Sequence, residues 1–197
     1  AKVMMRLKIL LLALAAVSSA AAAPASTDRG WMADGRFAAE IEAFAEPSAV
    51  PMNGEVTLFL GSSSIRLWNV ALGFPALHPV NRGFGGATVG DVLFHYDRLV
   101  AGVRPASVVV YVGENDIAEG AAPERVAADV LTLLGRLRAD MPKARIAWLS
   151  MKPTPRRRHL YQRMEAVNVA GQRCGVKGGS SIEEMLMLPR GEDSTGE

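Results

Sequence analysis

Three consecutive serines, Ser62 to Ser64, stand where an apolar run of the chain ends. The run covers residues 56–60, and Gly61 separates it from the serines. Hydroxyl groups at such a junction can cap a helix, bind a phosphate group or present a nucleophile. Other segments of the chain indicate which of these three chemistries applies.

Two further segments place glycine and polar residues directly after an apolar stretch. NRGFGG (81–86) continues from a short stretch at residues 79–81, and GENDI (113–117) follows the run SVVVYV at residues 107–112. In an open α/β sheet, ligands bind outside the carboxyl ends of the strands. Glycine, Asn and Asp also form ordinary turns, but three such segments in one chain favour a site at one edge of a sheet.

Known nucleotide-binding and hydrolase motifs do not fit these segments. A P-loop needs a second glycine followed by lysine, and GSSSIRLW (61–68) has neither. A dinucleotide site needs GxGxxG after the first strand, and RGFGGATVG (82–90) has a different spacing and a later position. The GxSxG elbow of α/β-hydrolases is also absent, because Ser63 is followed by Ser64 and Ile65.

The elements that must position these residues alternate between strands and helices. Short continuous apolar runs are typical of strands covered on both faces, and apolar residues at helical spacing indicate helices. Strand followed by helix, repeated along the chain, predicts an α/β fold with a parallel sheet and helices on both faces. The expected strands are 56–60, 79–81, 107–112 and 146–150, and the expected helices are 31–45, 91–100 and 123–141.

Composition excludes several classes of partner and cofactor. The chain has 197 residues with a net charge of +2, which is too balanced to indicate a nucleic-acid partner. Its single cysteine, Cys174, excludes an internal disulfide framework and a cysteine-built zinc site. We therefore expect no metal and no other cofactor.

The amino terminus has the pattern of a secretory signal peptide. Lys2, Arg6 and Lys8 precede the apolar run 9–17, and small residues follow at 18–23. The apolar run is shorter than the ~20 residues that span a membrane. We expect residues 1–23 to be removed and the remaining chain to be periplasmic or secreted, without stable membrane insertion.

Three blocks of the chain resemble the SGNH/GDSL hydrolase superfamily of esterases, lipases and carbohydrate acetylesterases. FLGSSSIRLW (59–68), VNRGFGGATVGDV (80–92) and VVVYVGENDIAEG (108–120) occur in the family's order. SMKPTPRRR (150–158) resembles the strand-end segment that follows in one branch of the family. The resemblance implies a three-layer α/β/α sandwich of the flavodoxin-like kind, in a hydrolase domain at residues 24–170.

The resemblance also implies the roles of three catalytic residues. Ser63 falls on the nucleophile, although Ser62 stands where the family has aspartate, and Gly86 and Asn115 fall on the oxyanion-hole positions. Gly61 would allow a tight turn before the nucleophile, and Gly86 would let the backbone approach the reacting group closely. We expect Ser62 and Ser64 to cap the following helix or to form local hydrogen bonds, and Asp116 to be a structural hydrogen-bonding residue.

The family's closing Asp-x-x-His block, which supplies the base that activates the serine, is not found. The three histidines are His78, His95 and His159, and none has an aspartate three residues before it. We expect each to be structural or exposed to solvent. Residues 171–197 show no strand–loop–helix pattern, so we expect an atypical tail of the kind that a frameshift or truncation produces, and an incomplete carboxyl-terminal part of the fold.

The sequence therefore predicts a serine esterase that acts through an acyl-serine intermediate and lacks a recognisable base. Short-chain acyl esters and sugar O-acetyl esters are the substrates that the resemblance implies, so the partner would be a small molecule or a glycan. The alternative is a non-catalytic module that binds a glycan or acyl ligand on the same scaffold. The sequence leaves the oligomeric state open.

Overall fold

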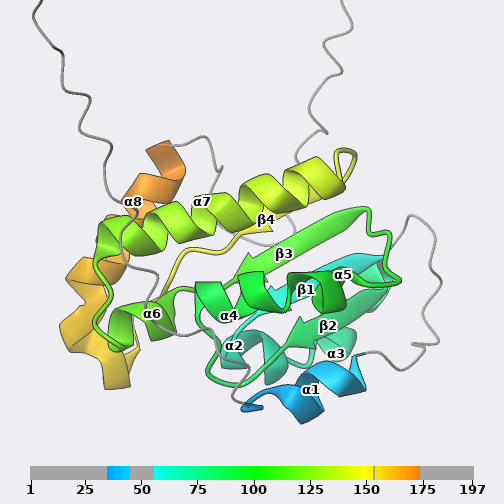
Figure 1. Ribbon diagram of the computed structural model, residues 1–197, viewed down its shortest axis with the longest axis horizontal. Helices are drawn as coiled ribbons and strands as arrows, with labels where there is room; N and C mark the ends of the chain where they lie inside the picture. The colour runs from blue at the N-terminus through cyan, green and yellow to red at the C-terminus, as the bar shows by residue number, and fades with distance from the viewer. Residues whose placement is uncertain (1–34, 45–55, 153, 174–197) are drawn as a thin grey trace, which may run out of the picture. The chain divides into compact units, whose positions relative to one another are not determined.

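A four-stranded parallel sheet forms the centre of the protein (Figure 1). The computed structural model describes residues 35–44, 56–152 and 154–173. Within them, the strand order is β2-β1-β3-β4, and β1 pairs with both β2 and β3. The strands are β1 (Thr57–Gly61), β2 (Pro79–Gly83), β3 (Ser107–Tyr111) and β4 (Arg145–Trp148). All four lie close to the expected positions.

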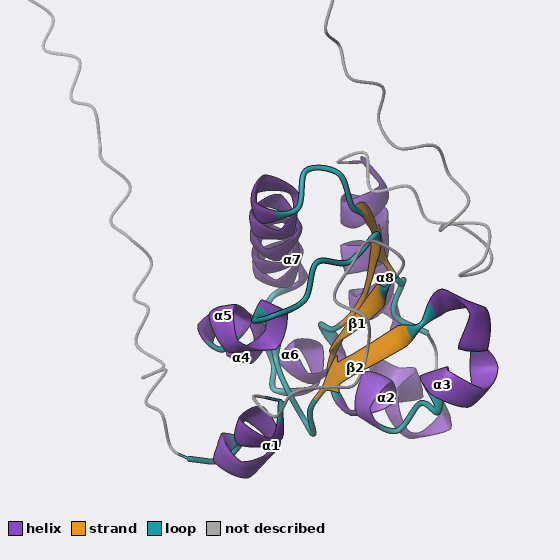
Figure 2. Ribbon diagram, turned by 90° about the vertical axis from the view of Figure 1, so that its right-hand side faces the viewer, coloured by secondary structure: helices purple, strands orange, loops and turns teal. Residues whose placement is uncertain are grey.

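Helices cover both faces of this sheet, as expected. Helices α1, α4, α5 and α7 lie on one side, and α2 and α3 on the other (Figure 2). The α-helices are α1 (Ala38–Ala43), α2 (Ser63–Arg66), α3 (Val70–Gly73), α4 (Val89–Phe94), α5 (Tyr96–Val100), α6 (Glu114–Ala118), α7 (Pro123–Asp140) and α8 (Tyr161–Arg173). Two 3₁₀ helices, η1 (Pro75–Leu77) and η2 (Pro155–Leu160), complete the described elements.

Alternate residues of the central strands enter two separate apolar clusters. In β1, Leu58 and Leu60 face the larger cluster, which α1, α4, α5, α7 and α8 cover, whereas Phe59 faces the smaller one. The smaller cluster joins the sheet to α2 and α3 through Ile65 and Val70. Full burial of one such side chain contributes about 1.5–3 kcal/mol. The burial of both faces explains why β1 and β3 read as continuous apolar runs.

Two of the expected helices have different limits in the structure. The helix expected at 31–45 is α1, six residues long, and residues 31–34 and 45 lie outside the described residues. The helix expected at 91–100 begins at Val89 and breaks at His95, whose ring lies edge-on to Phe84 and whose φ of −91° and ψ of 5° leave the helical region.

Helix α8 was not expected from the sequence. It packs against α7, and its Met164 and Val167 are buried in the larger cluster. It continues to Arg173, three residues beyond the expected domain limit at 170. The expected signal peptide at 1–23 and the rest of the expected tail lie outside the described residues.

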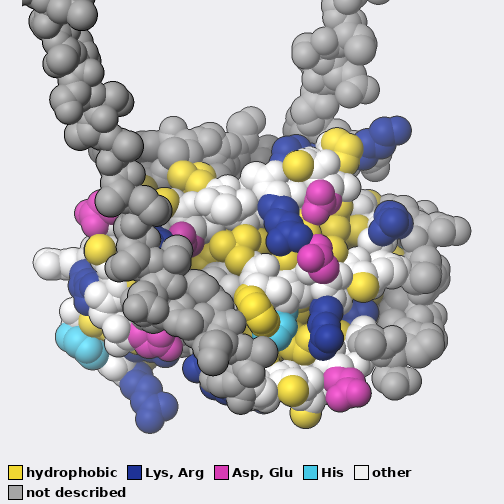
Figure 3. All heavy atoms as spheres, viewed as in Figure 1, with side chains coloured by type: hydrophobic (Ala, Val, Ile, Leu, Met, Phe, Trp, Pro, Cys, Tyr) yellow, Lys and Arg dark blue, Asp and Glu magenta, His cyan; other side chains and the backbone are white. Residues whose placement is uncertain are grey.

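On the face seen in Figure 3, basic and acidic side chains are interspersed, so neither charge dominates that face. Among the described helices, none is long and apolar enough to cross a membrane. The same residues contain no group of three or more His, Cys, Asp or Glu side chains arranged to hold a metal ion.

Candidate active site

The three polar segments emerge from neighbouring strands at the same edge of the sheet. Gly61, at the end of β1, is in register with Gly83 of β2 and with Tyr111 of β3. The Ser62 N–H donates to the Tyr111 carbonyl (3.1 Å), and the Phe84 N–H donates to the Gly61 carbonyl (3.1 Å). These bonds hold the starts of the three segments side by side, which confirms the expected common edge.

Ser63 begins helix α2 directly after this edge. Its side chain is part-buried, and the preceding Ser62 is 2% exposed and occupies the N-cap position with an extended backbone. Of the two roles expected for the Ser62 side chain, capping is excluded, because its hydroxyl makes no capping hydrogen bond. The helix is instead fixed by the Ser62 carbonyl, which accepts from the N–H groups of Ile65 and Arg66.

Two glycines let α2 lie directly on the sheet. A Cβ on Gly61 would lie 2.0 Å from the Tyr111 carbonyl oxygen, and the φ of Gly61 is +145°. A Cβ on Gly83 would lie 2.4 Å from the backbone nitrogen of Arg66 in α2. Neither position has room for a side chain, so these glycines fix the position of Ser63 relative to β2 and β3.

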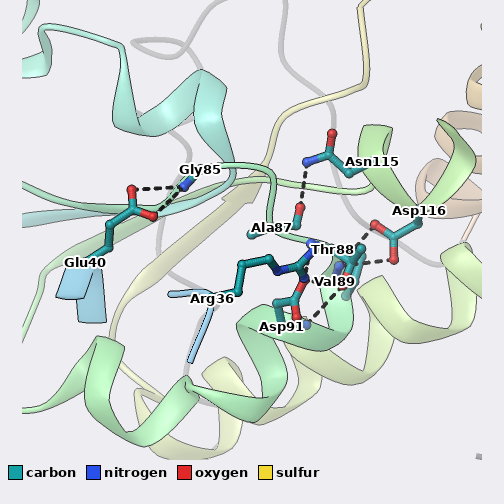
Figure 4. Close-up of polar contacts among 9 residues, drawn as sticks. All are labelled: Arg36, Glu40, Gly85, Ala87, Thr88, Val89, Asp91, Asn115 and Asp116. Atoms are coloured by element: carbon teal, nitrogen blue, oxygen red, sulfur yellow. Dashed lines mark hydrogen bonds and ion pairs between the residues drawn. The ribbon is translucent and has the colours of Figure 1, made fainter. Parts of the chain in front are cut away.

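Gly86 lies in the loop between β2 and α4, and its backbone conformation is left-handed. A Cβ there would meet nothing within 4 Å, so close backbone approach within the described residues does not require glycine. The requirement comes instead from its φ of +74°, a left-handed conformation that residues with a Cβ rarely adopt. The neighbouring Gly85 N–H donates to the Glu40 carboxylate (3.2 Å), which ties the loop to α1 (Figure 4).

Asn115, in α6, is bonded to the loop that carries Gly86. Its Nδ2 donates to the Ala87 carbonyl (2.8 Å; Figure 4). Its Oδ1 accepts from Nη2 of Arg157 (2.8 Å). The residue is 8% exposed. A carboxamide nitrogen carries two N–H groups, and the second makes no hydrogen bond with a described residue. Asn115 therefore has a fixed orientation and one N–H left for another acceptor.

Asp116 has the structural role expected for it. Both carboxylate oxygens lie 3.1 Å from the Val89 N–H, at the first residue of α4 (Figure 4). Burial raises the pKa of Asp116 to about 6, while the bond from Val89 acts in the opposite direction. A capping box between Thr88 and Asp91 fixes the same end of α4. Asp116 thus joins α6 to the start of α4, which follows the loop that holds Gly86.

Two charged residues beside Asn115 were missed by sequence reasoning. Glu114 is 6% exposed, its Oε2 lies 3.9 Å from Nη1 of Arg157, and its Oε1 has no hydrogen-bond partner. Arg157 comes from η2, forty-two positions along the chain from Asn115. Their only sequence signals were the glutamate within GENDI and the arginine run of 156–158. The Arg157 guanidinium joins η2 to Asn115.

The three histidines lie in different parts of the described structure. His78 precedes the first residue of β2 and so lies at the amino edge of the sheet, opposite Ser63. His95 lies between α4 and α5 among aromatic rings, and His159 is exposed in η2. The structure brings Asn115 to the loop of Gly86, and Ser63 to the same sheet edge.

Comparison with known proteins identifies related families and folds. The model of the GDSL-like lipase/acylhydrolase family matches residues 66–178, which include Gly86 and Asn115 and begin just after Ser63. No curated protein sequence matches the chain.

Solved structures with a similar fold include three bacterial proteins. A candidate platelet activating factor of Streptococcus pneumonia is 21% identical with a TM-score of 0.58, covering 69% of this chain and 66% of its own. A GDSL-like lipase of Bacteroides thetaiotaomicron is 22% identical with a TM-score of 0.53, covering 72% and 70%. A psychrotrophic esterase of Pseudoalteromonas, inhibited by monoethylphosphonate, is 17% identical with a TM-score of 0.50, covering 64% and 76%. At these identities the likeness concerns the fold.

Proposed function

The chain belongs to the GDSL-like lipase/acylhydrolase family of ester-hydrolysing enzymes, and on that premise we propose that it is a serine esterase whose nucleophile is Ser63. The observation that carries the proposal is the tie between Asn115 and the loop of Gly86, at the sheet edge where Ser63 begins α2. The residues that supply the Ser63 hydroxyl, the Asn115 side-chain N–H and the Gly86 backbone N–H therefore belong to segments that meet at one edge of the sheet.

The reaction follows from these groups. The Ser63 oxygen attacks the ester carbonyl carbon, and the carbonyl electrons move onto oxygen to give a tetrahedral oxyanion. The free N–H of Asn115 and the backbone N–H of Gly86 donate to this oxyanion, where such donors strengthen as charge develops. Collapse expels the alcohol and leaves an acyl-serine, which water then cleaves to the free acid and Ser63. A base must take the serine proton and return it to the leaving alcohol.

Short-chain acyl esters and sugar O-acetyl esters are the proposed substrates. The support is the family and the names of the similar structures, which include a lipase and an esterase. We further propose export to the periplasm or the medium, with removal of residues 1–23. Amino-terminal sequencing of the protein from an exporting host should give a start near residues 20–25, and a mature chain that begins at Ala1 in the membrane fraction would contradict export.

A second candidate function is a non-catalytic module that binds a glycan or acyl ligand. The observation that favours it is that none of His78, His95 and His159 has an aspartate three residues before it, as the family's base has. Without a base, oxyanion and binding effects alone leave about 10³–10⁴-fold acceleration over water in serine hydrolases.

A comparison of two forms of the chain separates the two candidates. We expect the chain as printed to hydrolyse p-nitrophenyl acetate slowly, with little change in Ser63→Ala. Addition of a carboxyl-terminal segment that carries Asp-x-x-His should raise the rate and make it depend on Ser63. Thr132→Ala, which removes an exposed hydroxyl on α7, is the matched control and should keep the raised rate. An extended chain that gains no Ser63-dependent turnover, while circular dichroism shows it folded, would favour the binding module.

A further inference from the structure

A cavity of about 530 Å³ adjoins the proposed nucleophile on the α2 side of the sheet. Ser64, the residue next to Ser63, lines it together with Leu67 and Trp68 of the α2 region. Tyr111 and Leu149 supply the wall from the ends of β3 and β4. Its volume lies within the roughly 300–1,000 Å³ of small-molecule sites. The cavity is therefore large enough for the apolar part of a small ligand.

The cavity opens at the edge of the sheet that holds the reacting groups. The Tyr111 carbonyl accepts from the Ser62 N–H, so the wall formed by Tyr111 is bonded to the residue before Ser63. The walls are mostly apolar, and Leu67 is 76% exposed although it is a large apolar side chain. An apolar ligand group placed here would remove that leucine surface from water, which is favourable.

A positive charge stands at the rim of this apolar cavity. The Lys152 ammonium lies 5.9 Å from the centre of the Tyr111 ring, and the side chain is exposed. Among the described residues, no carboxylate forms an ion pair with Lys152. The Tyr111 hydroxyl, which accepts from the Lys152 N–H (3.4 Å), stays uncharged because burial raises the pKa of Tyr111. The rim thus offers the Lys152 cation. The buried Glu114 carboxylate, which also raises the pKa of Tyr111, lies near the same tyrosine.

We propose that this cavity binds the apolar part of an amphipathic anion, and that Lys152 pairs with the anionic group. This rests on the proposed function, because it assigns to the esterase site a substrate class: esters whose acyl or alcohol part is apolar and carries a carboxylate or a similar anion. A neutral short-chain ester would fill the cavity without using Lys152. The preference for an anion is therefore the distinguishing feature.

Binding of octanoate tests the proposal without any need for turnover. The chain as printed is titrated with octanoate, with octanol as the neutral partner of equal length, and with acetate as the charge alone. Fluorescence of Trp68 reports binding, and Trp68→Phe identifies its share of the signal. We expect octanoate to bind about two- to fivefold more tightly than octanol, the range of an exposed ion pair, and acetate not to saturate.

Three variants divide the apolar from the ionic contribution. Lys152→Met keeps the apolar stem, so it should weaken octanoate to the affinity of octanol and leave octanol unchanged. Leu67→Ser should weaken both ligands. Leu72→Ser is the matched control, because Leu72 is 78% exposed on α3 and does not line the cavity; it should change neither affinity.

The proposal would be overturned if octanoate and octanol bound with equal affinity. It would also be overturned if Lys152→Met left the affinity for octanoate unchanged, or if Leu67→Ser left the affinities for both ligands unchanged. Ser63→Ala distinguishes this failure from failure of the esterase proposal. That variant should bind octanoate like the original chain, because the hydroxyl of Ser63 does not line the cavity. Normal octanoate binding without Ser63-dependent turnover in the extended chain would refute only the esterase.

Discussion

Replacement of Gly61 by alanine should destabilise the protein more than any other glycine substitution at the site. The new Cβ would lie 2.0 Å from the Tyr111 carbonyl oxygen at a φ of +145°. Backbone strain in such a conformation costs about 1–3 kcal/mol, and overpacking costs about 1–3 kcal/mol. Separation of β1 from β3 would also break the bond from the Ser62 N–H, worth about 0.5–1.5 kcal/mol. We expect a loss of about 3–6 kcal/mol, out of the roughly 5–15 kcal/mol of a typical domain.

Substitutions at three other glycines separate the effect of backbone strain from that of steric overpacking. Gly86→Ala meets only the strain of its φ of +74°, because the space is open, and should cost about 1–3 kcal/mol. Gly83→Ala meets steric contacts without that strain, because its Cβ would lie 2.4 Å from the Arg66 nitrogen and 2.7 Å from the Ile65 side chain. Gly135→Ala lies within α7, in open space, and should stabilise the helix by about 0.5–1 kcal/mol.

Urea unfolding followed by far-ultraviolet circular dichroism measures these differences in the chain as printed. The midpoint concentration gives the change in the free energy of unfolding if the slope m stays constant. The expected order of stability is Gly135→Ala, the original chain, Gly86→Ala, and last Gly61→Ala. A Gly61→Ala variant as stable as Gly86→Ala would refute the reasoning, because the ends of β1 and β3 would then separate without significant cost.

The remaining predictions concern the residues around Gly86. Burial raises the pKa of Asp116 to about 6 from an ordinary 3.8, so the folded protein binds this proton more tightly than the unfolded chain. The Asp116 contribution to stability should fall by about 3 kcal/mol as the pH rises from about 3 to about 7, and urea titrations of Asp116→Asn should lack this slope. In the extended chain, Asn115→Ala should lower kcat by about 10²–10³ with a smaller change in KM, measured with p-nitrophenyl acetate; unchanged kcat would remove Asn115 from the site. Arg157→Ala, which frees the Asn115 oxygen, should lower kcat about tenfold, and Arg157→Lys should recover part of that loss.

The strands and the common edge could be predicted because they depend on local pattern. A run such as 108–112 is continuously apolar because both faces of β3 are buried. The glycine and polar residues after each run mark the carboxyl ends, and parallel pairing brings those ends together whatever the order of the strands. The positions of Ser63 and Asn115 at one edge followed from this rule.

Contacts that depend on tertiary packing could not be predicted in the same way. Nothing in SMKPTPRRR shows that Arg157, rather than its neighbours, contacts Asn115, because that choice depends on how η2 packs against α6. The left-handed conformation of Gly86 gave no separate signal within a run that contains three glycines. The break at His95 reflects ring contacts with residues distant in the sequence. Helix α8 has only a weak apolar stripe, because Met164 and Val167 are its only large apolar residues in the core.

The most direct test of the central claim is the site of covalent modification by a fluorophosphonate. The reagent forms a stable bond with an activated serine oxygen, so peptide mapping by mass spectrometry can distinguish Ser63 from Ser62 and Ser64. We predict an adduct on Ser63 in the extended chain, slower labelling of the same residue in the chain as printed, and no adduct in Ser63→Ala. An adduct on Ser62 or Ser64, or a folded extended chain that stays unlabelled, would contradict Ser63 as the nucleophile.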